Sequence, residues 1–114
     1  MHFIVTAYDG TDENAYQRRL NTREAHLANA KRMMVDKKLL YAAALLGDGG
    51  KMIGSMMITD FPSEADLRAE WLEAEPYVTG GAWAKIEITP CKVPDFCLDA
   101  RWMHAQQDGG AELG

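Results

Sequence analysis

Apolar and polar positions follow two periods along this chain, and the changes between them mark out its secondary structure. HFIVTAY alternates and is rich in β-branched and aromatic residues, which predicts a strand over residues 2–8 that ends at DGTD. Residues 13–38 contain no proline or glycine and gather cations toward their end, as a long helix does. The apolar run LLYAAALL, the turn GDGGK and the alternating MIGSMMITD together predict a hairpin over residues 39–60.

The rest of the pattern adds one more helix and one more strand. Pro62 and Ser63 predict the start of a second helix, with Ser63 as its cap, and Pro76 predicts its end near Glu75. AWAKIEIT then alternates as a half-buried strand over residues 82–89, and the prolines after it discourage a regular central strand. The order strand, helix, strand, strand, helix, strand predicts an α+β, ferredoxin-like fold, with a four-stranded antiparallel sheet and two helices on one of its faces.

The second face of such a sheet has no helix to cover it. Several large apolar residues exceed what two helices can bury, so some are expected on this open face. A monomer rarely exposes an apolar surface of that size, and a second subunit would cover it. The pattern therefore predicts a homodimer through the open face. The residues concerned are Met56, Met57, Trp83 and the large residues of 39–46.

Length and charge narrow the class of protein. A chain of 114 residues with 47% apolar residues indicates a single globular domain. The net charge of -5, with cations scattered among more numerous carboxylates, argues against nucleic-acid binding. No apolar run approaches the roughly 20 residues of a membrane-spanning helix, and the N-terminus lacks the features of a secretion signal. The protein is expected to be cytoplasmic and not bound to membranes.

Neither a metal nor another cofactor is expected. Cys91 and Cys97 lack the tight spacing and the four ligands of a zinc knuckle, and both thiols are expected to stay reduced. The histidines are dispersed along the chain. GDGGK leads into a strand, whereas a phosphate-binding loop leads into the N-terminus of a helix, so its glycines are interpreted as a turn.

The first predicted helix carries polar residues beside its apolar face. At about 100° per residue, Arg23 falls inside the apolar arc, and Arg19 and His26 lie at its border. In one interpretation these groups are structural, with Arg23 reaching past apolar neighbours to solvent and His26 hydrogen-bonded in the core. In the other, Arg19 and Arg23 hold a carboxylate in a pocket and His26 transfers a proton. Helix periodicity leaves both open. The apolar arc comprises Tyr16, Leu20, Leu27, Ala30 and Met34.

In this order and spacing, four stretches resemble the YciI-like (YCII-related) family of the dimeric α+β barrel superfamily: AYD, RRLNTREAHL, GKMIGSMMITDF and WLEAEPYVTGGAW, within residues 2–93. The resemblance implies a ferredoxin-like subunit whose sheet packs against a partner's sheet, and a cleft lined by a histidine and a carboxylate. The matching histidine is His26. The family's Asp-Pro-Tyr aspartate falls on Glu75, one methylene longer, and Asp9 is a second family-type carboxylate. A Gly-Pro pair usual in the second strand is Ala43-Ala44 here.

The resemblance favours the second interpretation of the helix. Glu75 or Asp9 would accept a hydrogen bond from one imidazole nitrogen of His26, which leaves the other nitrogen free to take a proton. Arg23 would stabilise the resulting enolate or the substrate's own carboxylate. This chemistry suits isomerisation or elimination on a small anionic organic molecule, as in relatives that break down aromatic compounds. The candidate substrate-binding residues are Arg19, Arg23, Tyr77 and Ser55.

A non-catalytic function is the alternative hypothesis. A small-ligand-binding or accessory domain of the same fold would keep the pocket without turnover, and Glu75 in place of the family's aspartate favours it. A hydrolase is a weaker hypothesis, because Ser55 is a strand residue without the sharp turn that exposes a nucleophile.

The resemblance also sets the expected domain boundary. Residues 1–95 are expected to form the YciI-like domain, and residues 96–114 a C-terminal extension. The segment FCLDARWMHAQQ predicts a short helix that packs Phe96, Leu98 and Trp102, while DGGAELG is expected to fray.

Overall fold

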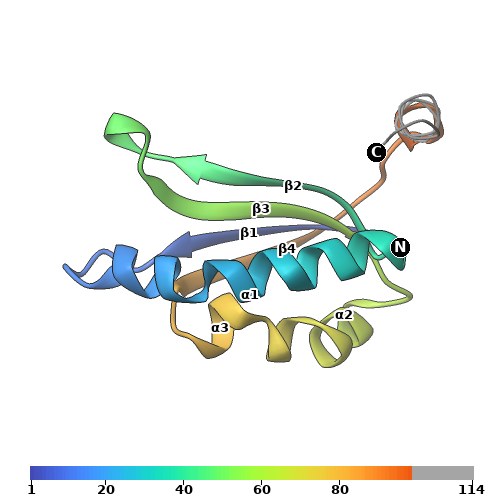
Figure 1. Cartoon of the computed structure of the whole chain (residues 1–114). Coiled ribbons are helices and arrows are strands. Elements are labelled where there is room, and N and C mark those ends of the chain that lie inside the picture. The colour runs from blue at the N-terminus through green and yellow to red at the C-terminus, as the bar shows by residue number, and fades with distance from the viewer. Residues whose placement is uncertain (99–114) are drawn as a thin grey trace, which may run out of the picture.

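A computed structural model describes residues 1–98. Its four strands form one antiparallel sheet in the order β2-β3-β1-β4, and α1, α2 and α3 lie together on one face of it (Figure 1). This arrangement confirms the predicted α+β, ferredoxin-like fold. In chain order the elements are β1 (His2–Asp9), α1 (Ala15–Val35), β2 (Leu39–Leu46), the 3₁₀ turn η1 (Asp48–Gly50), β3 (Met52–Asp60), α2 (Glu64–Glu70), the 3₁₀ turn η2 (Leu72–Ala74), α3 (Pro76–Thr79) and β4 (Trp83–Cys91).

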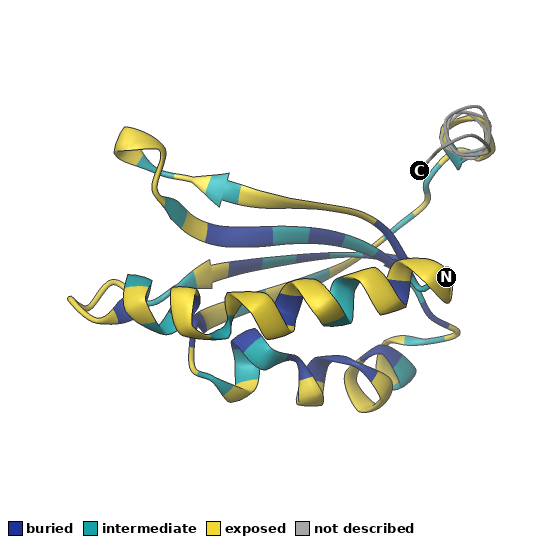
Figure 2. Cartoon of the chain, in the orientation of Figure 1, coloured by how far each residue is buried: buried dark blue, intermediate teal, exposed yellow. Residues whose placement is uncertain are grey.

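Alternate residues of the central strands face the helices and form the core. Val5 of β1 lies opposite Met57 of β3, and both are buried. The next pair, Ile4 and Ile58, points to the open face, because successive strand residues point to opposite sides. Buried residues accordingly alternate with less buried ones along much of β1 and β3 (Figure 2). The core comprises Phe3, Val5, Ala7, Met33, Leu39, Met57, Phe61, Leu67, Trp71, Leu72, Tyr77, Ala82 and Trp83.

Some large apolar residues were expected to lie on the open face, because two helices could not bury them all. In the structure these residues are divided between the two faces of the sheet. Met57 and Trp83 are buried beneath the helices. Met56 pairs with Thr6 and Tyr41 pairs with Ile58, which places both on the open face. The open face therefore carries part of the predicted apolar excess.

The predicted second helix consists of three short elements. Ser63 caps α2 as predicted, since its side chain accepts a backbone N–H bond of 3.1 Å. α2 ends before Trp71, whose φ of -131° leaves the helical region. Glu75 then caps α3 by accepting the backbone N–H of Tyr77, and Pro76 is the first residue of α3. Pro76 thus starts a helical turn where the pattern predicted only an end.

The last strand is longer than predicted. β4 runs past Thr89 to Cys91 and includes Pro90. Proline is tolerated here because β4 is an edge strand, paired only with β1. In β2, the Ala43-Ala44 pair keeps an uninterrupted register with β3, and the irregularities lie nearer the ends of that strand.

The buried face of α1 differs from the predicted one. Leu20, Leu27 and Met34 are 41%, 38% and 44% exposed, and Arg23 is exposed as well. The buried stripe is rotated by about 80° from the predicted arc, at 100° per residue. The prediction was wrong because the rotation depends on partners of buried polar groups elsewhere in the fold, which helix periodicity does not reveal. The buried residues of α1 are Ala15, Arg19, His26 and Met33.

Three sequence predictions concern the remaining features. No helix within residues 1–98 is long and apolar enough to cross a membrane. In the same range no cluster of three or more histidine, cysteine or acidic side chains could hold a metal ion. Trp102 and the DGGAELG segment lie outside the described residues, and the division at residue 95 stays a prediction.

Candidate functional site

Two buried polar contacts fix α1 to its neighbours, and the first is the ion pair of Arg19 with Asp9. Nη1 of Arg19 donates to both carboxylate oxygens of Asp9, at 2.9 and 3.2 Å. Nη2 donates to Oγ of Ser55 at 2.9 Å, and Ser55 also accepts the indole N–H of Trp83 at 3.3 Å. The Arg19 residue is only 2% exposed. A buried guanidinium is stable only with such partners, so α1, β1 and β3 are fastened at this point.

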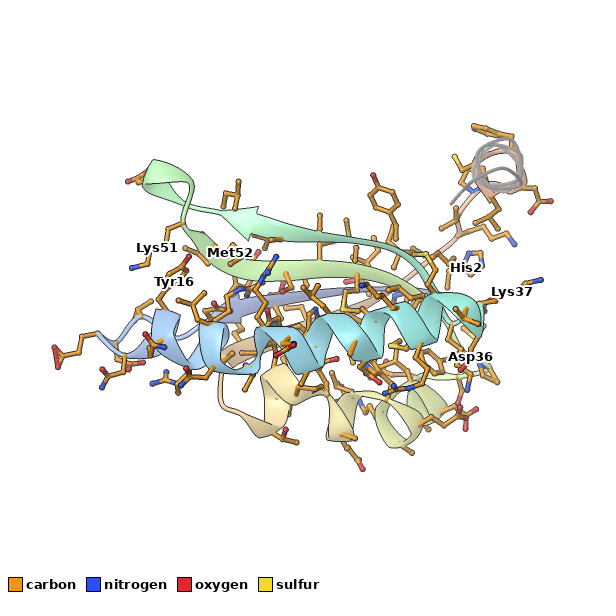
Figure 3. All side chains as sticks on the ribbon, in the orientation of Figure 1. His2, Tyr16, Asp36, Lys37, Lys51 and Met52 are labelled. Atoms are coloured by element: carbon orange, nitrogen blue, oxygen red, sulfur yellow. The ribbon has the colours of Figure 1, made fainter. Side chains whose placement is uncertain are left out.

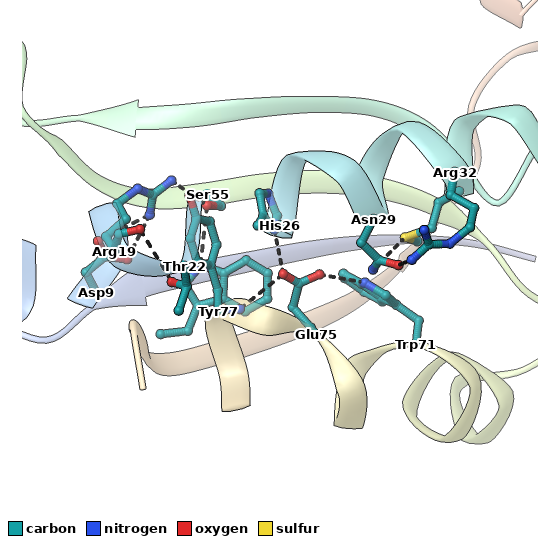
Figure 4. A network of polar contacts seen from close by, with 12 residues as sticks. Asp9, Arg19, Thr22, His26, Asn29, Arg32, Ser55, Trp71, Glu75 and Tyr77 are labelled. Atoms are coloured by element: carbon teal, nitrogen blue, oxygen red, sulfur yellow. Dashed lines mark hydrogen bonds and ion pairs between the residues drawn. The ribbon is translucent and has the colours of Figure 1, made fainter. Parts of the chain in front are cut away.

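The second contact joins His26 to Glu75. Nδ1 of His26 lies 2.5 Å from Oε1 of Glu75 (Figure 4). The same oxygen accepts the backbone N–H of Tyr77 at 3.2 Å, and Oε2 accepts the indole N–H of Trp71 at 2.9 Å. Glu75 is completely buried. The methylene that distinguishes Glu75 from the family's aspartate therefore does not separate the carboxylate from the imidazole.

These bonds determine which ring nitrogen of His26 carries a proton. Two of the donors to Glu75 are fixed, namely the indole N–H of Trp71 and the backbone N–H of Tyr77. A carboxylate that accepts both of them also accepts from His26 only if Nδ1 carries a proton. The network therefore assigns the proton of a neutral His26 to Nδ1 and leaves a lone pair on Nε2. Among buried side-chain polar atoms of residues 1–98, only Nε of Arg19 is sealed off without a partner. Nε2 of His26 makes no hydrogen bond within that range, so it retains access to solvent.

Tyr77 connects the two contacts. Its ring stacks on the His26 imidazole with centroids 4.0 Å apart and planes 16° apart, and Cζ of Arg19 lies 4.6 Å from the ring centre. Burial raises the pKa of Tyr77 above its ordinary value, against the lowering effect of Arg19 and Arg23. The hydroxyl stays protonated at neutral pH and makes no hydrogen bond within residues 1–98. Because it is not among the buried polar atoms that lack a partner, the hydroxyl has access to solvent.

The two aspartates near the start of α1 shift in opposite directions. Burial raises the pKa of Asp9, although Arg19 partly opposes this, so ionising Asp9 weakens the fold as pH rises above the ordinary value of 3.8. Asp12 is exposed and its hydrogen bonds from Arg18 lower its pKa to about 2. Its contribution is present above 3.8 and is lost as pH falls toward 2, and solvent screening keeps it small.

His26 lines a cavity of about 170 Å³ between α1 and the β2-β3 half of the sheet. Of its cationic side chains, Arg19 is paired with Asp9, whereas Arg23 forms no ion pair or hydrogen bond within residues 1–98. The cavity thus offers an unpaired cation beside the imidazole. Its lining comprises Arg19, Arg23, His26, Leu27, Ala42, Ala43, Ala44, Met52, Ser55, Met57 and Tyr77.

The structure brings most of the predicted site residues together. Arg19, Arg23, His26, Ser55 and Tyr77 line the cavity, and Glu75 lies behind His26. Asp9 does not contact His26, so of the two carboxylates left open by the sequence, Glu75 is the partner of the imidazole.

Asp9 instead faces a second cavity, of about 500 Å³, which opens beside the start of α1. The opposite wall carries Lys51, whose Nζ lies 4.6 Å from the centre of the Tyr16 ring (Figure 3). This cavity and the His26 cavity both include Met52 in their linings. The Asp9-Arg19 pair therefore stands between them.

Sequence reasoning missed two parts of the site. Trp71 donates to Glu75, and its position one helical turn earlier was the only available signal. Ala42 and Ala44 line the cavity from β2, where their small side chains leave room. Small residues in an exposed strand gave no signal of a site.

Comparisons with known proteins agree with this fold. The chain is 31% identical over 98 residues to Protein YciI of Escherichia coli O6:H1 and to that of Shigella flexneri, covering 81% of this chain and 97% of each relative. A solved structure of 5-chloro-2-hydroxyhydroquinone dehydrochlorinase (TftG) from Burkholderia phenoliruptrix, in complex with 2,5-dihydroxybenzoquinone, is similar with a TM-score of 0.72. It is 23% identical, and the match covers 84% of this chain and 98% of that one. The family model of the YCII-related domain matches residues 1–92, and the chain therefore belongs to the YCII-related domain family.

Proposed function

We propose that this protein is an acid-base enzyme in which Nε2 of His26 abstracts a proton from carbon in a small anionic substrate, leading to isomerisation or elimination. One observation carries the proposal: Nδ1 of His26 is bonded to the buried carboxylate of Glu75, while the imidazole lines a cavity and its Nε2 makes no hydrogen bond within residues 1–98. A carboxylate at Nδ1 stabilises the imidazolium that forms when Nε2 takes the proton. Glu75 is thus the orienting acid of the pair, and Asp9 orients Arg19.

Three further groups suit the charge that such a reaction develops. Proton loss next to a carbonyl places negative charge on oxygen, and donors aimed at that oxygen lower the barrier. Arg23 offers a cation without a partner in the described residues, and Tyr77 offers a protonated hydroxyl. Ser55 already accepts two bonds, so its own proton is available to a ligand. These three residues would bind the anionic end of the substrate beside Arg19.

The size of the cavity limits the substrate. About 170 Å³ corresponds to the share of roughly six water molecules, which suits a single ring or a short chain. Leu27, Met52 and Met57 provide apolar walls for its hydrocarbon part. No cofactor enters the proposed chemistry. The reaction would take place in the cytoplasm, where the free thiols Cys91 and Cys97 stay reduced.

Exchange of carbon-bound hydrogen for deuterium tests this proposal. Pyruvate, 2-oxobutyrate and phenylpyruvate would be incubated with the protein in D₂O and followed by proton NMR. We expect exchange of at least one of them above the buffer rate, and a loss of about a hundredfold in His26→Gln, because a positioned base contributes at least about that factor. The matched control is His2→Gln, a buried histidine outside the cavity.

The outcomes separate the proposal from its alternative. Exchange that is equal in wild type and His26→Gln, or no faster than in buffer, would count against catalysis by His26. If calorimetry then showed that wild type binds these anions and Arg23→Gln does not, the protein would be the non-catalytic ligand-binding domain.

We also propose that the protein is a homodimer, in which the open face of the sheet forms the interface. Its apolar residues gather on β1, β2 and β3, where Ile4, Tyr41 and Ile58 are neighbours in the pairing register. Toward β4 the face becomes charged, with Lys85 and Glu87 paired at 3.3 Å. An apolar centre with a charged margin is the usual anatomy of a subunit interface.

Mass measurement by light scattering tests this assembly. Wild type is expected at twice the mass of the chain, and Tyr41→Asp is expected to weaken association by at least about tenfold, because a buried unpaired charge is costly. Leu20→Asp is the matched control, since Leu20 is also exposed but lies on α1. Monomeric wild type, or equal loss in both variants, contradicts an interface on the open face.

A further inference from the structure

Trp71 holds the second oxygen of the site's carboxylate. Its indole Nε1 donates to Oε2 of Glu75 at 2.9 Å, and both residues are buried. The other oxygen, Oε1, already accepts from His26 and from the backbone of Tyr77. With Trp71 in place, both oxygens have a fixed donor, so the carboxylate cannot rotate about its last bond without losing hydrogen bonds.

Neighbouring aromatic rings hold the indole in this orientation. The Phe61 ring lies parallel to it, with centroids 6.4 Å apart and planes 11° apart. Trp83 meets it edge-on, with centroids 6.4 Å apart and planes 77° apart. These contacts come from two different segments of the chain. The indole N–H is therefore aimed at Oε2 by packing that does not involve the histidine.

Trp71 also separates Glu75 from solvent. On its outer side, Trp71 lines a cavity of about 160 Å³, together with Phe61, Arg32 and Lys38. This outer cavity shares no lining residue with the His26 cavity. Glu75 is fully buried beneath the indole, so the tryptophan takes the place that a water molecule would occupy at Oε2. Figure 4 shows Trp71 on the opposite side of Glu75 from His26.

We infer that Trp71 is a positioning residue. By stabilising the ionised carboxylate of Glu75, it keeps the proton of the His26-Glu75 hydrogen bond on Nδ1 of His26. This inference rests on the proposed function for its catalytic meaning, because an ionised Glu75 beside a protonated Nδ1 stabilises the imidazolium that forms when Nε2 takes the substrate's proton. Trp71 itself lies outside the His26 cavity and does not meet a ligand there.

The competing proton arrangement shows why a donor at Oε2 matters. Once Nε2 has taken a proton, the pair holds two protons, either as an ionised Glu75 beside an imidazolium or as a protonated Glu75 that donates to Nδ1 of an imidazole whose own proton is on Nε2. In the second arrangement Nδ1 is unprotonated, and no carboxylate charge stabilises an imidazolium. The indole N–H bonds to the ionised carboxylate more strongly than to the acid, so it opposes this arrangement. Removing a bond to a charged group is expected to shift the ratio of the two arrangements by about tenfold or more.

Nitrogen-15 NMR of the imidazole tests the inference without a substrate. In wild type, Nδ1 of His26 is expected to carry a proton throughout the pH range in which the protein is folded. In Trp71→Phe, which keeps an aromatic ring but removes the donor together with part of the indole's volume, the share of unprotonated Nδ1 is expected to rise by about tenfold. Phe61→Leu is the matched control, since it disturbs the packing of Trp71 without removing its N–H.

Three results would overturn the inference: an Nδ1 that stays protonated in Trp71→Phe, one already unprotonated in wild type, and an equal shift in Phe61→Leu. If Trp71→Phe fails to fold, Glu75→Gln replaces it. The indole resonance of Trp71 should then move upfield, more than that of Trp83, because its acceptor loses its charge. An unmoved Trp71 resonance would overturn the inference as well. None of these results depends on turnover, so they remain distinct from failure of the proposed function.

Discussion

Replacing Asp9 with alanine is expected to lower the free energy of unfolding by about 3 kcal/mol, because it leaves the guanidinium of Arg19 buried without its anion. Breaking a buried ion pair costs about 3–5 kcal/mol in other proteins. The lower end is expected here, since water from the cavity beside Asp9 can reach the guanidinium once the side chain is removed. The raised pKa of Asp9 does not contradict this, because an ion pair that is costly to bury is still more costly to break.

Asp12→Ala provides a matched comparison for Asp9→Ala. Asp12 pairs with Arg18 at 2.7 Å, but the two side chains are 52% and 35% exposed. Solvent screens exposed pairs of this kind, so Asp12→Ala is expected to lose much less stability than Asp9→Ala. Urea unfolding of both variants at neutral pH measures the difference. Equal losses in the two variants would show that the burial of Arg19 is not the dominant effect.

Replacing Glu75 with alanine is expected to destabilise the protein by about 3–5 kcal/mol. It is also expected to abolish the proposed exchange of the substrate's carbon-bound hydrogen for deuterium. Three donors lose their acceptor at once: Nδ1 of His26, the indole of Trp71 and the backbone N–H of Tyr77. The cap of α3 is lost with them. The imidazole also loses the group that fixes its proton on Nδ1, so Nε2 is no longer held as a base.

Glu73→Ala is the control for Glu75→Ala, because Glu73 is exposed and lies in η2, just before the cap of α3. An exposed substitution of this kind is expected to change stability by no more than about 0.5 kcal/mol. Thermal unfolding and the deuterium exchange assay measure both variants. A Glu75→Ala protein that is as stable as Glu73→Ala would contradict the structural importance of the carboxylate.

The fold was largely predictable from local pattern, and the orientation of α1 was not. The alternating strands and the turn between β2 and β3 are signals within a few residues, and they gave the correct order of elements. Leu20 and Leu27 look like core residues in a helix, yet the helix buries Arg19 and His26 instead. Asp9 and Glu75, the partners of Arg19 and His26, determine which face of α1 is buried. Both lie outside the helix, so its periodicity does not reveal that face.

The candidate site was predictable only in part, and for a related reason. The Arg-x-x-His pattern and the match of Glu75 to a family aspartate led to the imidazole-carboxylate pair. Trp71 escaped notice because the predicted helix ran through it without interruption. The structure breaks that helix at Trp71, which turns the indole N–H toward Glu75.

Ala42 and Ala44 give the cavity a wall that can change independently of the fold. They lie on β2, an edge strand, and are exposed, whereas His26 and Arg19 on the opposite wall are buried, and their bonds to Glu75 and Asp9 hold helices and sheet together. Larger or more polar side chains at these two alanines would reshape the pocket at little expense in stability. The two alanines are accordingly the first positions to vary when testing which ligands enter the cavity under the proposed function.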